Sequence, residues 1–489
     1  MRVLFIYPND YLNNGIPTGI STLSSVLKQK GHIVDIFDFT FIKTKPQKSE
    51  ADKEPNKYLP TEYTLEDLVA ADPIISLEKA FKQKIKLFYP DLIAVSVMTG
   101  YFDKVIDLLG KVRSNCKTIF GGIHPTISPY ETLKNDEVDF IGIGEGEGLL
   151  IDLLDALEKG KDYKRIKNLG YKENSVIKIN ELRPFVNMDE LPTPDWSLFD
   201  ERHMFRPFMG NIYKGSFFIM SRGCPGICTY CVNYALREKL KICGRYFRFQ
   251  SPKTIITQLK ELKEKFGATW FKFADDSMML FKVNYLEELT KGLKPLNINF
   301  GCSIRPETVT EQKIKLLKKM GMVAASVGIE SGNERLRRDV LRRSMTNEQI
   351  IKAVELLKKY HIRVSTFNMI GLPGETRENV FETIKLNKKL GVATTNVYII
   401  YPYPNTQLSI KYNINIYDVN GYITPVSHAS SFALSKIPPS EVEGLLRTFE
   451  LYVRLPEKIW PIIKIAEKSD KTAEELRKVL FCYMSDYYA

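Results

Sequence analysis

Short apolar runs alternate with amphipathic segments along the first third of the chain. The apolar runs lie at 3–6, 33–37, 92–97, 118–120 and 140–142, and each ends in a stretch rich in Gly, Pro, Ser or Thr. Runs of this length, separated by segments with helical periodicity, are typical of strands buried on both faces of a parallel sheet. The pattern therefore predicts a doubly wound, Rossmann-like α/β domain over residues 1–160.

A second alternation begins at residue 215, after a stretch that breaks the rhythm. Pro192 and Pro194 exclude a regular helix or a central strand there, so residues 161–214 are predicted to be a linker. Apolar runs follow at 217–220, 270–273, 299–303, 323–328, 364–370 and 395–399, with helical segments between them. A closed eight-unit barrel typically needs about 250 residues. We therefore expect a partial (β/α)6 barrel over residues 215–410.

The remaining residues, 411–489, are predicted to form a small mixed or helical C-terminal region, with a helix at 472–484. This region could take part in substrate selection. The composition, 44% hydrophobic and 26% charged, is that of an ordinary globular protein. No run of eighteen or more uncharged apolar residues occurs, and the chain starts without a signal-peptide pattern, so we expect a cytoplasmic protein with no transmembrane segment.

The formal net charge of +12 is compatible with an anionic substrate, an acidic protein partner, an anionic membrane surface or nucleic acid. The lysines are spread along the predicted helices, and no signature of a nucleic-acid-binding domain accompanies them. The sequence therefore argues against nucleic acid, and the charge slightly favours an anionic substrate.

Three of the seven cysteines lie within eight residues, as Cys224, Cys228 and Cys231. This crowding is poor spacing for a disulfide scaffold and favours metal or redox chemistry. Three thiolates can hold a 4Fe-4S cluster and leave one iron without a protein ligand, where an electron-transfer cluster has four cysteines. The alternatives are a zinc knuckle, for which Cys243 and His203 are remote fourth ligands, or free buried thiols.

The run Cys-x-x-x-Cys-x-x-Cys, with Tyr230 before its last cysteine, is similar to the signature of the radical SAM enzymes. The resemblance implies that the open iron chelates the amino and carboxylate groups of S-adenosylmethionine (SAM). It also implies that one electron, from a flavodoxin- or ferredoxin-type reductant, cleaves SAM to methionine and a 5′-deoxyadenosyl radical. In such an enzyme the cofactors carry the chemistry and the protein positions them.

Segments after several predicted barrel strands resemble the SAM contacts of that family, at the ends where barrel ligands bind. By this resemblance Asp275 faces the ribose, Glu330 or Ser331 the methionine end, and residues 370–376 the adenine. The SAM-binding residues identified in this way are Tyr230, Phe273, Asp275, Ser303, Arg305, Glu330, Ser331, Ile370 and Leu372.

The first domain resembles the cobalamin-binding (B12-binding) domains that precede many radical SAM barrels. The glycines at 142–148 do not form Gly-x-Gly-x-x-Gly and do not follow the first strand, so a nicotinamide site is disfavoured. A corrin is broad and flat, and small residues let the backbone approach it. The resemblance assigns cobalamin binding to Pro8, Asn9, Thr18, Gly19, Ile20, Met98, Thr99, Gly121, Gly122, His124, Gly144, Glu145 and Gly146.

Mutase-type cobalamin proteins supply a histidine to cobalt through Asp-x-His-x-x-Gly, but the stretch from Asp10 to Gly15 has Leu12 in that place. The resemblance thus implies cobalamin bound without a histidine lower ligand and with its tail displaced. His124 either belongs to a ligand loop or closes a turn before Pro125, and both interpretations stay open.

Two further groups have structural interpretations that we favour. Five arginines after the fourth barrel strand could guide an anionic substrate or the reductant, but a solvated helix face is the favoured explanation. They are Arg335, Arg337, Arg338, Arg342 and Arg343. Cys302 is expected to be an inert buried thiol. No catalytic acid or base is assigned, since hydrogen abstraction needs positioning more than proton transfer.

The two resemblances together imply a cobalamin-dependent radical SAM methyltransferase. The adenosyl radical would abstract hydrogen from an unactivated carbon, and methylcobalamin would then deliver a methyl group. The alternative is a non-methylating rearrangement, cyclisation or C–C coupling; a degenerate cobalamin sensor is disfavoured by the intact cysteines. A small molecule, lipid or peptide remains open as substrate, and the oligomeric state is not specified.

Overall fold

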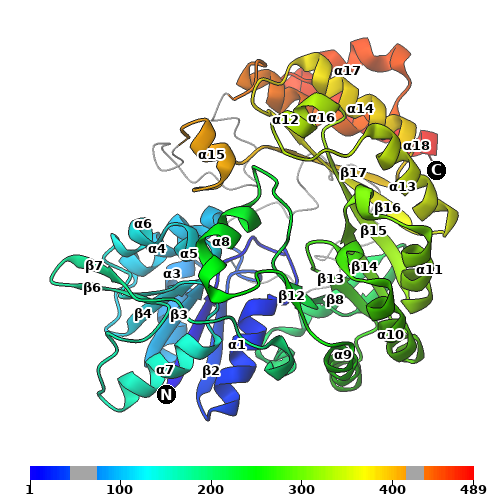
Figure 1. Cartoon of the computed structure of the whole chain (residues 1–489). Coiled ribbons are helices and arrows are strands. Elements are labelled where there is room, and N and C mark those ends of the chain that lie inside the picture. Colours follow the sequence, from blue (N-terminus) through cyan, green and yellow to red (C-terminus); the bar gives the residue numbers. More distant parts are fainter. Residues whose placement is uncertain (45–73, 415–433, 489) are drawn as a thin grey trace. The chain divides into compact units, whose positions relative to one another are not determined.

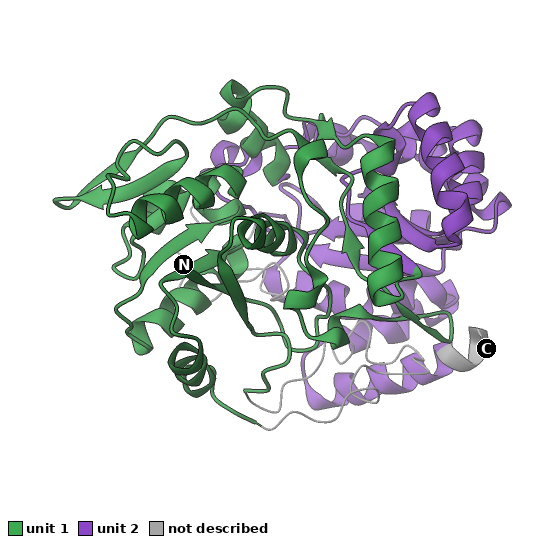
Figure 2. Ribbon diagram, turned by 90° about the horizontal axis from the view of Figure 1, so that it is seen from below, with its two compact units in different colours: residues 1–50, 65–225, 232–269 green, residues 51–64, 226–231, 270–489 purple. Residues whose placement is uncertain are grey.

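The computed structural model describes residues 1–44, 74–414 and 434–488 of the 489-residue chain (Figure 1). The chain divides into two compact units. The first comprises residues 1–50, 65–225 and 232–269, and the second comprises residues 51–64, 226–231 and 270–489 (Figure 2). The cysteine-rich segment contributes to both units, because Cys224 belongs to the first and Cys228 and Cys231 to the second.

A seven-stranded sheet with the strand order β2-β1-β3-β4-β5-β6-β7 forms the centre of the first unit. The strands are β1 (Arg2–Tyr7), β2 (Ile33–Asp38), β3 (Leu92–Ser96), β4 (Lys117–Gly121), β5 (Phe140–Gly142), β6 (Leu169–Glu173) and β7 (Val176–Ile179). The first five are parallel and confirm the predicted strands. Strands β6 and β7 form an antiparallel hairpin within the segment predicted as a linker.

Helices cover both faces of this sheet (Figure 1). They are α1 (Thr18–Gln29), α3 (Leu77–Phe88), α4 (Phe102–Lys111), α5 (Ile123–Ile127), α6 (Pro129–Leu133) and α7 (Glu147–Glu158), with a 3-10 turn η2 (Thr99–Tyr101). Helix α1 packs beside α7, and α3 beside α4. The order 2-1-3-4-5 of the parallel strands creates a switch point between β1 and β3, where doubly wound sheets bind ligands at the carboxyl ends of their strands.

The rest of the first unit contains short elements and two longer helices. They are η3 (Met188–Glu190), η4 (Trp196–Leu198), η5 (Glu201–Met204), β8 (Phe205–Phe208), β9 (Asn211–Lys214), β10 (Phe217–Phe218), β11 (Ser221–Arg222), α8 (Val232–Leu240), η6 (Lys241–Cys243), β12 (Arg248–Phe249) and α9 (Pro252–Phe266). The strand predicted at 217–220 is therefore only two residues long. It is followed by β11, which pairs with β12 in an antiparallel arrangement.

The predicted linker is packed firmly against the first domain through His203, which is fully buried. Its Nδ1 accepts a hydrogen bond from the backbone N–H of Gly15 at 2.9 Å. Nε2 therefore carries the proton, and it lies 2.5 Å from Oδ2 of Asp38. Because the His203 ring contacts the loop after β1 and the last residue of β2, this part of the predicted linker belongs to the first unit.

Five parallel strands form the sheet of the second unit in the order β13-β14-β15-β16-β17. They are β13 (Trp270–Phe273), β14 (Asn299–Ile304), β15 (Met322–Glu330), β16 (Arg363–Ile370) and β17 (Thr394–Ile399). All five lie where apolar runs predicted strands. The helices and turns between them are η7 (Met278–Leu280), α10 (Val283–Leu293), η8 (Lys294–Leu296), η9 (Pro306–Thr308), α11 (Glu311–Met320), α12 (Glu334–Asp339), α13 (Asn347–Lys359) and α14 (Arg377–Leu390).

The C-terminal region is helical, with α15 (Gln407–Lys411), α16 (Pro439–Arg454), η11 (Glu457–Ile459), α17 (Trp460–Ala466) and α18 (Lys471–Tyr488). The helix predicted at 472–484 is confirmed. Buried Phe449 and Tyr452 of α16 share a hydrophobic cluster with Ile384 of α14 and Val397 of β17. Among the residues that the structure describes, no helix is both long and apolar enough to cross a membrane.

Candidate cofactor sites

The three clustered cysteines are reduced and only slightly accessible. Cys224 is 9% exposed and Cys228 7%, while Cys231 is half-buried, and none forms a disulfide. The loop begins at Gly223, which has a φ of +83°. A Cβ at this position would lie 2.5 Å from the carbonyl oxygen of Tyr246, so both the backbone angle and the space require glycine.

In the described part of the chain no three His, Cys, Asp or Glu side chains surround a single ion. A cubane does not need such convergence, since its thiolates bind separate irons.

Thr229 fixes the loop between Cys228 and Cys231. Its Oγ1 donates to the carbonyl of Val340 at 2.6 Å, and its N–H donates to the carbonyl of Leu341 at 3.2 Å. The carbonyl of Thr229 accepts from the N–H of Leu408 at 3.0 Å. The segment after α12 and the helix α15 therefore hold this loop from two directions.

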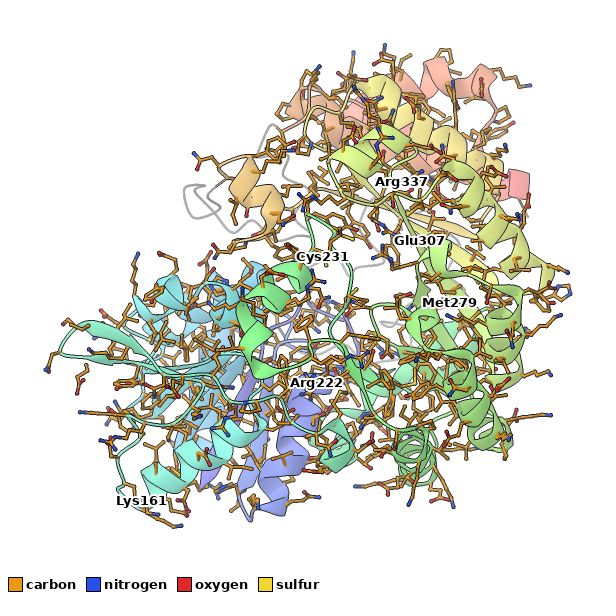
Figure 3. All side chains as sticks on the ribbon, viewed as in Figure 1. Lys161, Arg222, Cys231, Met279, Glu307 and Arg337 are labelled. Atoms are coloured by element: carbon orange, nitrogen blue, oxygen red, sulfur yellow. The ribbon has the colours of Figure 1, made fainter. Side chains whose placement is uncertain are left out.

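A group of alternating charges lies beside Cys228 in the second unit. Nη1 of Arg305 donates to Sγ of Cys228 at 3.7 Å, and Nη2 of Arg305 lies 2.6 Å from Oε1 of Glu307. Arg343 forms an ion pair with Glu330, and its Nη2 lies 3.8 Å from Oε2 of Glu307. Figure 3 labels Glu307 and Cys231 in this region. The group joins β14, β15 and the segment after α12.

Glu330 has the backbone conformation of a strained site. Its φ is +68°, unusual for a residue other than glycine, and the register between β15 and β16 shifts there. The carboxylate is buried and has a hydrogen bond with Tyr230. Burial raises the pKa of Glu330, and the charge of Arg343 only partly opposes this effect. The fold thus brings together three of the residues assigned to SAM, namely Tyr230, Arg305 and Glu330.

Arg343 corrects a prediction made from the sequence. The assignment of the arginines to a solvated helix face is wrong for Arg343, which is 4% exposed, and for Arg337, which is fully buried and donates to the carbonyls of Ser331 and Met345. Nε and Nη2 of Arg343 make no hydrogen bond to described residues. Because Arg342 has a φ of +53°, the chain turns back after α12 and carries Arg343 inward. Two buried donors beside a carboxylate suit the amino-acid end of a ligand.

Most other residues assigned to SAM are buried. Phe273 packs with Phe300 at a ring distance of 4.6 Å, so any ligand contact from it would come from the backbone. Ser303 is half-buried on β14. The fully or almost fully buried members of the set are Phe273, Asp275, Ser331, Ile370 and Leu372. Cys302 is also fully buried, as expected, and burial raises the pKa of its thiol to about 12.

Glu375, which sequence reasoning did not assign, shapes the loop after β16. Its Oε2 accepts from the N–H groups of Gly371 and Leu372 at 2.7 and 3.1 Å. Its other oxygen, Oε1, is buried without a hydrogen-bond partner among the described residues. Burial raises the pKa of Glu375 to about 8, and the two N–H groups only partly oppose the effect. The signal for this residue was its place in Gly-Leu-Pro-Gly-Glu-Thr, where a side chain can fold back on the turn.

The first unit contains a cavity of about 270 Å³ at the carboxyl ends of its parallel strands. Seven residues assigned to cobalamin line it: Thr18, Gly19, Gly121, Gly122, Gly144, Glu145 and Gly146. Residues that sequence reasoning missed include Thr22, Leu23, Ser96, Leu149, Gln250 and Gln258. A Cβ at Gly19 would meet nothing within 4 Å, so this wall is open to a ligand. The cavity's position and small residues fit part of a large, flat cofactor.

Ion pairs hold the glycine-rich wall of the cavity. The carboxylate of Glu145 lies 2.8 Å from Nη1 of Arg222 and 2.7 Å from Nη2 of Arg248, and it accepts from the N–H of Val186. Glu147 lies 2.6 Å from Nη2 of Arg222, which Figure 3 labels. Burial tends to raise the pKa of Glu145, but the two arginines outweigh it and the pKa is lowered.

The other residues assigned to cobalamin are not among those lining the cavity. They are Pro8, Asn9, Ile20, Met98, Thr99 and His124. Asn9 donates to Oγ1 of Thr40 at 2.9 Å and thereby shapes the loop after β1, and Met98 is 51% exposed. In that loop Leu12 is buried in a cluster with Tyr11 and Phe41. The binding of cobalamin without a histidine lower ligand stays a prediction.

His124 occupies a structural position in the first unit. It is fully buried and stacks on Phe102 with 4.2 Å between the ring centroids. Its Nδ1 lies 3.3 Å from Oγ1 of Thr99, and burial lowers the pKa of the imidazole to about 4. Because His124 lies within α5, this geometry favours a structural role over a place in a ligand loop.

Comparisons with known proteins identify two domains in the chain. A family profile described as the Radical SAM superfamily matches residues 218–387, and one described as the B12 binding domain matches residues 63–154. The uncharacterized methyltransferase PH0819 of Pyrococcus horikoshii is 31% identical over 330 residues, which are 66% of this chain and 70% of that protein. The anaerobic magnesium-protoporphyrin IX monomethyl ester cyclase of Rubrivivax gelatinosus is 24% identical over 451 residues, which are 87% and 73% of the two chains.

Solved structures share the fold. The radical SAM methyltransferase TsrM of Kitasatospora setae, with cobalamin and a [4Fe-4S] cluster bound, superposes with a TM-score of 0.64 at 16% identity and covers 84% of this chain and 74% of its own. OxsB, a cobalamin-dependent SAM radical enzyme, also gives 0.64 at 16% identity, over 99% and 71%. The chain therefore belongs to the cobalamin-dependent radical SAM enzymes, in which a B12-binding domain precedes a radical SAM domain and the cofactors are a 4Fe-4S cluster, S-adenosylmethionine and cobalamin.

Proposed function

We propose that this protein is a C-methyltransferase, which forms a 5′-deoxyadenosyl radical to take hydrogen from an unactivated carbon and then transfers a methyl group from cobalamin to that carbon. The observation that carries the proposal is the 31% identity to a relative named as a methyltransferase, over 330 residues of this chain. The substrate is proposed to be a small molecule, lipid or peptide. The electron is proposed to come from a flavodoxin- or ferredoxin-type protein.

The cofactors supply the radical and the methyl group when they are bound, and the chain positions them. Cys224, Cys228 and Cys231 are proposed as the cluster ligands. Arg343 offers two buried donors to a carboxylate, and the Glu330 carboxylate can accept from an amino group. These two groups together match the two charged ends of an amino acid, which is why we place the methionine end of SAM there.

Cyclisation is the second candidate function. The cyclase relative of Rubrivivax gelatinosus aligns with 87% of this chain, compared with 66% for the methyltransferase relative. Cyclisation by this chain would use the same cofactors and the same proposed SAM site. The two candidates differ in whether a methyl group leaves SAM.

Quantifying the reaction products distinguishes the two candidate functions. The full chain is reconstituted anaerobically with iron, sulfide and hydroxocobalamin, and then given a reductant, methyl-labelled SAM and fractionated metabolite extracts. Methylation predicts equal amounts of labelled product, S-adenosylhomocysteine and 5′-deoxyadenosine. Formation of 5′-deoxyadenosine with no S-adenosylhomocysteine and no labelled product would reject methylation and favour cyclisation or another rearrangement.

A further inference from the structure

A row of hydroxyl side chains crosses one face of the sheet in the second unit. Ser303 of β14 pairs with Ser326 of β15, Ser326 with Ser365 of β16, and Ser365 with Thr394 of β17. Residues paired directly across parallel strands point to the same side of a sheet, so the four hydroxyl groups lie side by side. Oγ of Ser365 is 3.4 Å from Oγ of Ser326. The neighbours on the opposite face, including Cys302 and Val327, belong to the buried core.

Lys272 of β13 reaches this row from the edge. It pairs with Gly301, which in turn pairs with Ala324, so the two residues beside it are small. Its Nζ donates to Oγ of Ser326, two strands away, at 3.1 Å. The lysine therefore extends across Gly301 and ends among the hydroxyl groups.

Lys272 has no acidic partner among the described residues. None of their carboxylate oxygens lies within 4 Å of its Nζ, the limit for an ion pair. Arg305 and Arg343, the neighbouring cations of the barrel, each pair with Glu307 or Glu330. Burial lowers the pKa of Lys272. A partly buried ammonium whose hydrogen bond goes to a neutral hydroxyl has lost part of its hydration, and a bound anion would compensate for that loss.

Along β15, the row of hydroxyl groups comes just before the group of alternating charges. Gly328 is two residues beyond Ser326 on β15 and shares its face, and two residues of strand span about 7 Å. A Cβ at Gly328 would lie 2.5 Å from Oε1 of Glu330 and 3.0 Å from Nη1 of Arg343. The ion pair of Glu330 and Arg343 therefore folds over Gly328. An anion at Lys272 would lie next to the proposed methionine end of SAM, on the face that a substrate must reach.

We propose that Lys272, Ser326 and Ser365 bind an anionic group of the substrate, a carboxylate or a phosphate, inside the barrel. The inference rests on the proposed function, because it takes the barrel face beside the SAM site as the place of the substrate. It narrows the substrate to a molecule with one such group a short distance from the carbon that loses hydrogen.

The test uses the full chain with its cluster reconstituted and its lysines reductively dimethylated with ¹³C, a change that keeps the ammonium charge. The Lys272 resonance is identified by its absence in Lys272→Met. Acetate and inorganic phosphate are the probes and chloride is the control anion. We expect acetate or phosphate to shift this resonance saturably, and Ser326→Ala to weaken the effect about tenfold, the loss of one hydrogen bond to a charged group.

Lys313 on α11 provides the matched control, because burial also lowers its pKa and its Nζ donates only to a neutral group, the carbonyl of Met279. If its resonance shifts in parallel with that of Lys272, or if neither shifts, the site is rejected. The proposal is also rejected if SAM alone shifts the Lys272 resonance and blocks acetate, because the lysine would then bind the SAM carboxylate. Lys272→Arg lacks this resonance, so its binding of radiolabelled acetate is followed by equilibrium dialysis; it should still bind the anion, which separates charge from folding.

Failure of this proposal is distinguishable from failure of the proposed function. Wild-type protein and Lys313→Met are assayed in parallel for 5′-deoxyadenosine formed from SAM and a reductant without substrate. If neither forms it, the proposed function has failed whatever the anions do. If both form it and no anion binds at Lys272, only the inference about the substrate has failed.

Discussion

Arg305 donates a hydrogen bond from Nη1 to Sγ of Cys228, with 3.7 Å between the two atoms. The same guanidinium pairs with Glu307, which also lies near Arg343. One arginine thus connects a proposed cluster ligand with the charges that would hold the methionine end of SAM. A substitution of Arg305 should therefore change both the reduction potential of the cluster and the affinity for SAM, and the two effects can be measured independently.

Arg305→Gln should make the reduction potential of the cluster more negative, because it removes a positive charge and a hydrogen bond from a coordinating sulfur. It should also weaken SAM binding by about tenfold to a hundredfold, the range for loss of a charged hydrogen bond. Redox titration followed by EPR and equilibrium dialysis measure the two effects. Arg338→Gln, which removes an exposed side chain paired with Asp339, is the control and should change neither quantity. Unchanged values in both variants would exclude this role for Arg305.

Thr229→Val should destabilise the cluster loop by about 1 kcal/mol, since it removes the hydrogen bond from Oγ1 to the Val340 carbonyl while keeping the size of the side chain. The expected result is faster loss of iron to a chelator under anaerobic conditions. Thr229→Ser keeps the hydroxyl group and should lose iron at nearly the wild-type rate. Equal rates in the two variants would mean that the backbone hydrogen bonds of Thr229 are sufficient.

Gly19→Leu should reduce cobalamin binding with little effect on folding. A side chain at this position meets no protein atom within 4 Å at its Cβ and would extend over the cavity. Equilibrium dialysis with hydroxocobalamin measures the affinity, and circular dichroism checks the fold. Gln29→Leu, at the exposed end of the same helix, is the matched control. If Gly19→Leu binds cobalamin as tightly as wild type, the cofactor does not use this wall.

Glu375 should make the stability of the protein depend on pH. Its pKa is raised to about 8 by burial, so the folded state binds a proton that the unfolded state releases above its ordinary pKa of 4.5. Its contribution to the free energy of unfolding is therefore complete below about pH 4.5 and is lost as the pH rises to about 8, by at most about 1.4 kcal/mol per pH unit. Urea denaturation between pH 5 and pH 8 should show a smaller decline for Glu375→Gln than for wild type. Parallel curves would contradict the raised pKa.

Arg222→Met should destabilise the first unit by about 3 kcal/mol, because Glu147 loses its partner and Glu145 keeps only Arg248. The urea midpoint followed by circular dichroism measures this effect. Adding Glu147→Gln to Arg222→Met should recover part of the loss by removing the unpaired carboxylate. Lys159→Met, which breaks an exposed pair with Asp155, is the control and should leave the urea midpoint nearly unchanged.

The amino-acid sequence determined the elements and the proposed cluster ligands. The ten strands from β1 to β5 and from β13 to β17 lie where apolar runs predicted them, because short runs bounded by turn residues indicate a strand whatever its partners are. The spacing of Cys224, Cys228 and Cys231 is a local property of one loop. The strand predicted at 217–220 was a partial success, since the two residues of β10 are too few for a strong pattern.

Only the tertiary structure decided which side chains meet. Arg338 and Arg343 look alike in the sequence, yet Arg338 is exposed and Arg343 is buried beside Glu330, because the positive φ of Arg342 reverses the chain. Lys272 was one lysine among many until the register of three strands carried it to Ser326. Burial and partners depend on contacts between residues far apart in the chain, and the periodicity of a sequence records only the face on which each residue lies.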